Sequence, residues 1–422
     1  LANKTSKSMA AAKRYILVHI AGGLILLAGI ILHINGTGSI EFTHFATQNL
    51  STWFILIGFL VNAAAIPFSS WLPDAYPEGS YSSTVFLSAY TTKTSVFVLI
   101  STFAGNHILI AVGIYMIIYG IIYALLENDI RRILSYSIVN QVGFMIVGIG
   151  IGTELSINGT AAHAFAHILY KGLLLMSAGS VLYMINKRKC TDVGGLYKVM
   201  PITAICGIIG ALAISAFPLT SGFISKSMIV DASYREGLEF VWLMLLVGSA
   251  GVFLHAGIKF PWFVFFHNDK KIKTEDPPFF MKTAMIIMSF LCIIIGIIPE
   301  SLYTLLPYKI DFIPYTGNHI ISQLHLLLFS GLAFFVSLKY LERTLTITLD
   351  FDWFYRNKIK YIYAITNFMS RISSNLMKMI VLNNIKNRFN VLESYLMKQF
   401  TISTMLTLIL ITFSIVLLFN IS

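Results

Sequence analysis

Eleven long apolar runs divide this chain, and they constrain its fold more than any other feature of the sequence. A helix that crosses a membrane needs about 20 mostly apolar residues. The runs cover residues 15–34, 50–68, 82–104, 108–126, 133–151, 161–184, 201–230, 238–266, 281–299, 321–338 and 401–420. Charged residues make up 12% of the chain, against about 25% in a soluble domain. The sequence therefore predicts an all-α, polytopic transmembrane helix bundle.

Basic residues collect at every second loop between these runs, which predicts the orientation. One set of ends carries Lys4, Lys7, Lys13, Arg14, Arg131, Arg132, Lys187, Arg188, Lys189, Lys270, Lys271, Lys273, Lys339 and Arg343, and the opposite loops offer only Arg235 and Lys309. Short cytoplasmic loops carry an excess of Lys and Arg. We therefore expect a multi-pass membrane protein with its basic loops in the cytoplasm. The same distribution argues against nucleic acid as a partner, although the net charge is +11.

Two of the runs are interrupted by residues that break helices. The run 201–230 is too long for one straight crossing, because thirty helical residues extend about 45 Å. Phe217–Gly222 interrupts it with a proline and a glycine, and a second interruption lies at Pro67–Pro77. Paired breaks are typical of transporters with internal repeats and ion sites at the breaks. Proline kinks without such a role are the alternative.

Four lysines lie inside apolar runs, namely Lys93, Lys171, Lys226 and Lys259. A charged side chain in hydrocarbon costs at least ~2.5–3.5 kcal/mol, so such residues usually face a bundle interior or a wet path. This pattern predicts ion or proton transport. Lys226 and Lys259 lie close to the ends of their runs, so for them snorkelling to the membrane surface is the alternative.

His163, His167 and Lys171 follow one another at four-residue spacing. On a helix this places them on one face over ~12 Å. Because histidine titrates near neutrality, a water-bridged stripe of such groups can pass protons. Asn62, Asn140 and Gln141 add weaker polar points that either line the path or join helices.

The sequence predicts no cofactor, no metal site and no catalytic residues. Cys190, Cys206 and Cys292 lack metal-ligand spacing, and no dinucleotide fingerprint, P-loop or iron–sulfur pattern is present. We therefore expect no redox or ATPase chemistry in the chain itself. Residues 350–400 mix basic with apolar residues and contain no proline. They predict a basic amphipathic helix, which acts as a strut, as a partner contact or as a membrane-surface tail.

Several motifs resemble the proton-translocating antiporter family. They are Trp71–Glu78, Leu87–Thr94, Glu127–Ser137, His163–Lys171, Asp192–Tyr197 and Gly222–Lys226, and the tail Leu349–Arg356 resembles the Mrp branch. This family comprises the antiporter-like membrane subunits of respiratory complex I and the Mrp-type multisubunit cation/proton antiporters. The nearest resemblance is to the D component of the Mrp-type antiporters.

The resemblance implies two inverted five-helix repeats, each with one broken helix. We expect 1–104 to be the end of the first repeat and 105–266 the second. We expect further transmembrane helices in 267–349, and the amphipathic segment with a final helix in 350–422. The resemblance also implies a central line in which Lys93, His163, His167 and Lys171 lead to Lys226.

Two departures from the family pattern affect the first repeat. Asn62 stands where the family has a lysine, and the helix with the family's partner glutamate would precede residue 1. The resemblance therefore implies an incomplete input half-channel. A fragment of a longer product, a separate polypeptide that supplies the missing helices, and a decaying gene are the open explanations.

The sequence predicts a proton-conducting subunit of a multisubunit Na⁺/H⁺ antiporter. Its expected partners are other antiporter or complex I-like membrane subunits, protons, Na⁺ and the lipid bilayer. One alternative is a proton-pumping subunit of an NADH:quinone oxidoreductase or related hydrogenase, which would be classed as an enzyme component. The other is a non-transporting assembly or scaffold fragment.

Overall fold

A computed structural model describes residues 5–46, 49–341, 350 and 353, and all regular elements in them are helical. The α-helices are α1 (Ser6–Thr37), α2 (Leu50–Asn62), α3 (Trp71–Ala75), α4 (Ser83–Phe103), α5 (Ile108–Leu126), α6 (Ile130–Ile151), α7 (Glu154–Ile185), α8 (Pro201–Ile214), α9 (Ser221–Arg235), α10 (Glu239–Val252), α11 (Phe279–Ile297), α12 (Glu300–Tyr303), α13 (Gly317–Val336) and α14 (Leu338–Leu341). Short 3₁₀ turns span Tyr76–Glu78 and Leu196–Lys198, and π-helical segments span Phe253–Lys259 and Trp262–Phe266.

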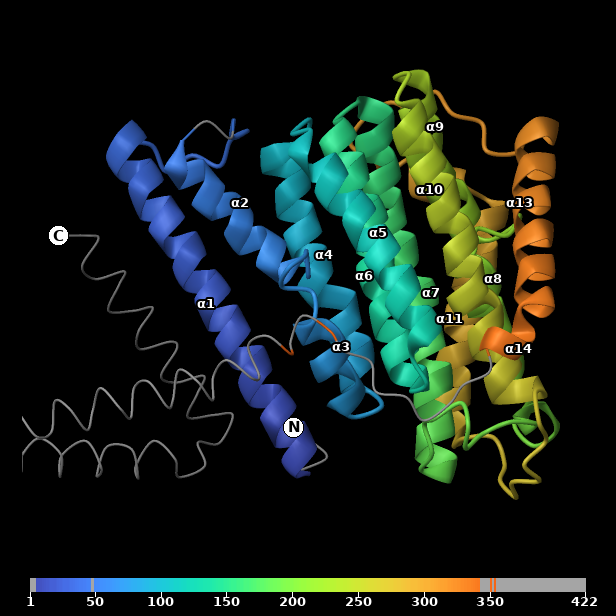
Figure 1. Cartoon of the computed structure of the whole chain (residues 1–422). Coiled ribbons are helices and arrows are strands. Elements are labelled where there is room, and N and C mark those ends of the chain that lie inside the picture. The colour runs from blue at the N-terminus through green and yellow to red at the C-terminus, as the bar shows by residue number, and fades with distance from the viewer. Residues whose placement is uncertain (1–4, 47–48, 342–349, 351–352, 354–422) are drawn as a thin grey trace, which may run out of the picture. The chain divides into compact units, whose positions relative to one another are not determined.

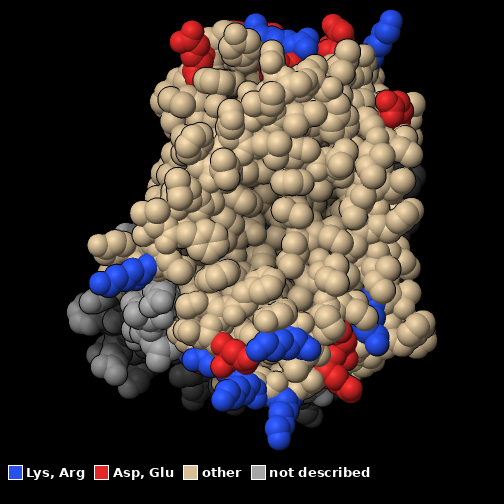
Figure 2. Space-filling view, turned by 90° about the vertical axis from the view of Figure 1, so that its right-hand side faces the viewer, with Lys and Arg blue, Asp and Glu red and all other residues tan. Residues whose placement is uncertain are grey.

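The described residues contain eight helices that are long and apolar enough to cross a membrane. They are α1, α4, α5, α6, α7, α10 with its π-helical continuation to Phe266, α11 and α13. On the face that Figure 2 shows, charged side chains lie at the two ends, and the surface between them carries none. The chain is thus the multi-pass membrane protein that the sequence predicts. The expected span 401–420 and nearly all of the amphipathic segment lie outside the described residues.

Helix α6 forms the centre of the bundle, and its span is entirely buried. It packs against α4, α5, α7 and α9. A Cβ atom on Gly113 of α5 would lie 2.6 Å from the Gly143 carbonyl oxygen of α6, so only glycine permits this close approach. The outer helices α1 and α13 expose most of their apolar surface and stand at opposite ends of the row of helices (Figure 1).

Two helices are broken, as the sequence predicts, and they run in opposite directions (Figure 1). Helix α2 ends at Asn62 before α3, and α8 ends at Ile214 before α9. The first break begins at Ala63, which is earlier than the expected Pro67–Pro77. Trp71–Ala75 returns to a helix because Pro73 lies in the first turn, where no backbone N–H is required.

The two breaks share one hydrogen-bond pattern, known as the Schellman motif. In each, an alanine takes the left-handed conformation, which is unusual for a residue with a side chain. These alanines are Ala64 (φ 58°) and Ala216 (φ 57°). The backbone N–H of Ala64 donates to Val61 (3.1 Å) and that of Ala65 to Leu60 (2.9 Å), as Ala216 donates to Ala213 (3.1 Å) and Phe217 to Leu212 (3.0 Å). This equivalence supports the expected inverted repeats.

The described residues up to Asp350 belong to one compact unit. The finer boundaries at 104, 266 and 349 stay predictions.

Ion pairs tie the first break to the loops beside α6 and α7. They lie at the end of the bundle that carries the basic loops, called the basic end below. Glu78 pairs with Lys7 at 3.0 Å and with Arg188 at 2.7 Å, and Arg188 also pairs with Asp129 at 2.7 Å. Burial raises the pKa of Glu78, but Arg188 and Lys7 outweigh this effect and hold it below its ordinary value. Burial raises the pKa of Asp129 against the opposing charge of Arg188.

Candidate proton path

All four lysines predicted from the sequence are buried in the bundle. Lys171 and Lys259 are fully buried, Lys226 is 1% exposed and Lys93 is 7% exposed. They lie on α4, α7, α9 and the π-helical segment Phe253–Lys259. The snorkelling alternative for Lys226 and Lys259 is therefore wrong, because neither side chain reaches the surface.

Lys93 makes its hydrogen bonds within α4. Its Nζ atom donates to the Ser88 carbonyl at 2.8 Å and to the Thr92 hydroxyl at 3.2 Å. These partners hold the ammonium in the bundle interior, on the side of the first break.

Lys171 reaches from α7 to α6. Its Nζ atom donates to the Ser137 hydroxyl at 2.8 Å, and the Leu134 carbonyl lies at 3.5 Å. Neutral oxygens therefore stabilise the ammonium at the centre of the bundle.

His163 bridges three helices. Its Nδ1 atom lies 3.2 Å from the Ser225 hydroxyl of α9, and its Nε2 atom lies 3.1 Å from Oε1 of Gln141 on α6. The Tyr170 hydroxyl donates to the same Gln141 oxygen at 3.1 Å. Gln141 in turn donates to Asn140, which donates to the Ile117 carbonyl of α5. The sequence-predicted Gln141 thus joins the histidine line, whereas Asn140 joins α6 to α5.

His167 lies between His163 and Lys171 and is fully buried. Its ring centroid is 6.4 Å from that of His163 and 5.3 Å from that of Tyr170. Neither of its ring nitrogens has a hydrogen-bond partner among the described residues. Lys93 and Lys171 both lie within Coulombic range of the ring. The His167 ring therefore experiences the charges of lysines on both α4 and α7.

Lys226 follows the second break and points back to it. Its Nζ atom donates to the carbonyl of Ile214 at 2.8 Å and lies 5.0 Å from the ring centroid of Phe144. The equivalent end of α2 is closed differently, because the Trp71 indole N–H donates to the Val61 carbonyl at 3.0 Å. The second break thus holds a cation at the last carbonyl of α8, whereas a neutral indole binds the carbonyl one residue before the end of α2.

Lys259 binds the end of α5. Its Nζ atom donates to the carbonyls of Ala124, Leu125 and Glu127 at 2.7, 2.9 and 2.6 Å. The C-terminus of a helix carries partial negative charge, which stabilises a cation there.

Asn62 stands apart from the other predicted residues. It is the last residue of α2 and is half-buried. No hydrogen bond in the described part of the chain joins it to the lysine and histidine line. Sequence reasoning missed Ser137 and Ser225 as partners, because a serine on a transmembrane helix carries no signal of what faces it.

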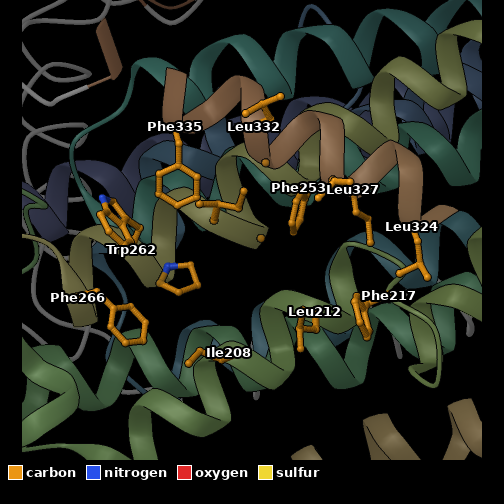
Figure 3. Close-up of a pocket in the computed structure, with 15 residues that line it drawn as sticks. Ile208, Leu212, Phe217, Phe253, Trp262, Phe266, Leu324, Leu327, Leu332 and Phe335 are labelled. Carbon is orange, nitrogen blue, oxygen red and sulfur yellow. The ribbon is translucent and has the colours of Figure 1, made fainter. Parts of the chain in front are cut away.

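An apolar cavity of about 650 Å³ lies away from this line, beside α8 and α13 (Figure 3). Its wall includes Ile208, Leu212, Phe253, Trp262, Leu324 and Phe335. Its apolar lining cannot stabilise an ion, so the candidate path is the polar line.

These features define a multi-pass membrane protein with two oppositely directed broken helices around buried ionisable groups. The family described as NADH:quinone oxidoreductase/Mrp antiporter, transmembrane, matches residues 1–298. The chain belongs to this family, which confirms the resemblance found in its motifs.

Three comparisons illustrate the range of the family. Hydrogenase-4 component B of Escherichia coli (strain K12) is 26% identical over 338 residues, covering 70% of this chain and 50% of the relative. Antiporter subunit mnhD2 of Staphylococcus aureus (strain JH9) is 26% identical over 312 residues, covering 69% of this chain and 62% of the relative. The Mrp complex structure from Dietzia sp. DQ12-45-1b contains a chain with the same fold, with a TM-score of 0.64 and 20% identity over 70% of this chain and 66% of that one. This chain thus spans less than two thirds of the length of either relative.

Proposed function

We propose that this chain conducts protons as a membrane subunit of a multisubunit monovalent cation/proton antiporter, with Na⁺ as the coupled cation. The observation that carries the proposal is the buried line of Lys93, His167, Lys171, His163 and Lys226. Buried ionisable groups in membrane helices are costly, and transport is their usual reason.

In this mechanism a proton passes between neighbouring basic groups. Protonation of Lys93 and Lys171 shifts charge along His167 and His163, and electrostatic repulsion expels a proton by way of Lys226. Moving one charge across 100 mV is worth about 2.3 kcal/mol, so modest changes in the interaction between sites are enough to couple them.

The comparisons support the antiporter assignment and its setting. The family description includes the Mrp antiporters, and one relative bears the name of an antiporter subunit. We infer that other membrane subunits complete the transporter, that it lies in the bacterial cytoplasmic membrane, and that the basic loops face the cytoplasm.

Everted vesicles from a host without its own Na⁺/H⁺ antiporters test this proposal. The complete complex is expressed, respiration builds a pH gradient, and Na⁺ is added. We expect Na⁺ to dissipate the gradient with the wild-type complex and to have no effect with Lys171→Ala. A complex that assembles but gives no response even with wild-type sequence would favour the scaffold alternative and contradict the proposal.

The second candidate is a proton-pumping subunit of a hydrogenase or quinone oxidoreductase, which the similarity to hydrogenase-4 component B favours. The same residues would act, with redox partners as the energy source. Purification of the native complex separates the two, because iron–sulfur or flavin subunits would co-purify only in the second case.

A further inference from the structure

One buried histidine lies outside the predicted line. His255 is fully buried in the π-helical segment that ends at Lys259. Neither ring nitrogen makes a hydrogen bond of ordinary geometry, although the Gly251 carbonyl lies nearby on the same helix. A buried polar group without a hydrogen-bond partner costs about 1–3 kcal/mol of folding free energy. A histidine that serves only to pack at this position would therefore destabilise the protein.

The surroundings of His255 connect the centre of the bundle to its basic end. Its segment packs against α5, α6 and α8. Lys171, Lys259 and Lys226 all lie within Coulombic range of the ring. Lys171 belongs to the central line through Ser137 of α6, whereas Lys259 binds the end of α5.

We propose that His255 is a further relay residue, which carries protons between Lys171 and Lys259. It thereby connects the buried line to the loop between α5 and α6 at the basic end of the molecule. This inference rests on the proposed function.

The chemistry requires only the imidazole ring. A neutral ring accepts a proton at one nitrogen and releases one from the other, so the ring ends neutral and as the other tautomer. Because the charges of Lys171, Lys259 and Lys226 all disfavour a charged ring, His255 passes a proton without holding a lasting charge. The helical pitch places His255 and Lys259 one turn apart on the same face.

The π-helical conformation of the segment Phe253–Lys259 determines the position of His255. A π turn is rare and is frequently found at functional sites. The side of the segment that holds Phe253 and Ile258 lines the apolar cavity of Figure 3, whereas His255 and Lys259 are buried in the bundle.

Proton flux in vesicles that contain the complete complex tests the relay. We compare His255→Phe, which keeps a ring but not the exchangeable protons, with His255→Gln, which keeps polarity but cannot exchange tautomers. His325→Phe is the matched control, because His325 is exposed on α13. Complex content on blots normalises the rates. We expect both His255 variants to lose flux at least about tenfold and the control to keep it.

The result separates this inference from the proposed function. Wild-type flux in either His255 variant, with Lys171→Ala inactive, would overturn the relay and leave the proposed function standing. Full flux in Lys171→Ala would overturn the proposed function itself. A histidine that only packs would be replaced successfully by glutamine, so loss in both variants at normal complex content supports the relay.

Discussion

The ammonium of Lys226 donates a 2.8 Å hydrogen bond to the carbonyl of Ile214, which is the last residue of α8. The break exposes this carbonyl, and the side chain that follows the break binds it. The negative end of a half-helix thus faces a cation in the membrane interior, which is how broken helices form ion sites.

Replacing Lys226 with methionine is expected to stop transport with little change in stability. The lost hydrogen bond to a charged group is worth about 1.5–3 kcal/mol, and removal of a buried charge returns at least ~2.5–3.5 kcal/mol. We therefore expect the free energy of unfolding in detergent to fall by no more than about 0.5 kcal/mol and to rise by up to about 2 kcal/mol. Lys309→Met, at an exposed loop, is the control. Retained transport with strong destabilisation would mean that Lys226 is structural.

Arg131 is expected to be structural, in contrast to the lysines. It is 1% exposed, and its guanidinium donates to the carbonyls of Pro77, Gly79 and Ser80 at 2.9, 2.9 and 3.0 Å. Arg131→Ala removes three hydrogen bonds from a charged donor, although the Pro77 carbonyl keeps Arg188 and the Ser80 carbonyl keeps Thr84 as donors. We therefore expect a loss of at least about 3 kcal/mol in the free energy of unfolding.

The control for Arg131 is Arg235→Ala at the opposite end. Arg235 pairs with Asp231 at 2.7 Å on the surface of α9, and exposed pairs contribute less than about 1 kcal/mol. Equal effects of the two variants in denaturant titrations would contradict the role assigned to Arg131.

Gly222 is expected to be essential for the geometry of the second break. A Cβ atom there would lie 1.8 Å from the Ala213 carbonyl oxygen, which forces the two half-helices apart. We expect Gly222→Ala to cost at least about 2 kcal/mol and to impair transport. Gly23→Ala is the control, because nothing lies within 4 Å of its Cβ position and alanine favours the helix. A harmless Gly222→Ala in a thermal melt would contradict this packing.

Glu78 is expected to make stability depend on acid pH. The pKa of Glu78 in the folded protein lies below its ordinary value of 4.5, because Arg188 and Lys7 outweigh the effect of burial. Such a group stabilises the fold above its unfolded-state pKa, and this contribution is lost as pH falls through the folded-state pKa. We therefore expect Glu78→Gln to lower the melting temperature at about pH 7, with a difference that shrinks below about pH 4.5.

Glu239→Gln, at an exposed position, is the control for Glu78. It should leave the difference between neutral and acid pH as in wild type. A Glu78→Gln variant with the wild-type melting temperature at neutral pH would show that the ion pairs contribute nothing to stability.

The sequence predicted helices well where composition alone decides them. Helix α5 begins and ends at the expected residues, 108 and 126, because a continuous apolar run ends at Glu127. The first break was placed too late, because Ala64 in the left-handed conformation gives no sequence signal. Prolines were expected to mark the break, but Pro73 lies in the first turn of the new helix α3.

The partners of the buried lysines were beyond sequence reasoning for a different reason. Lys226 binds a carbonyl of the preceding half-helix, and Lys259 binds carbonyls at the end of α5, far away in the chain. Every residue has a backbone carbonyl, so these contacts cannot be predicted from the residue types in the sequence. Whether each lysine snorkels or stays inside follows only from the packed structure.

The most direct test of the account is proton flux across proteoliposomes that contain the complete complex with one lysine removed at a time. Lys93→Ala, Lys171→Ala and Lys226→Ala are compared with Lys309→Ala at equal complex content. If the buried groups form one line in series, each of the first three variants abolishes flux and the fourth retains it. Wild-type flux after loss of any one of Lys93, Lys171 or Lys226 would contradict the account.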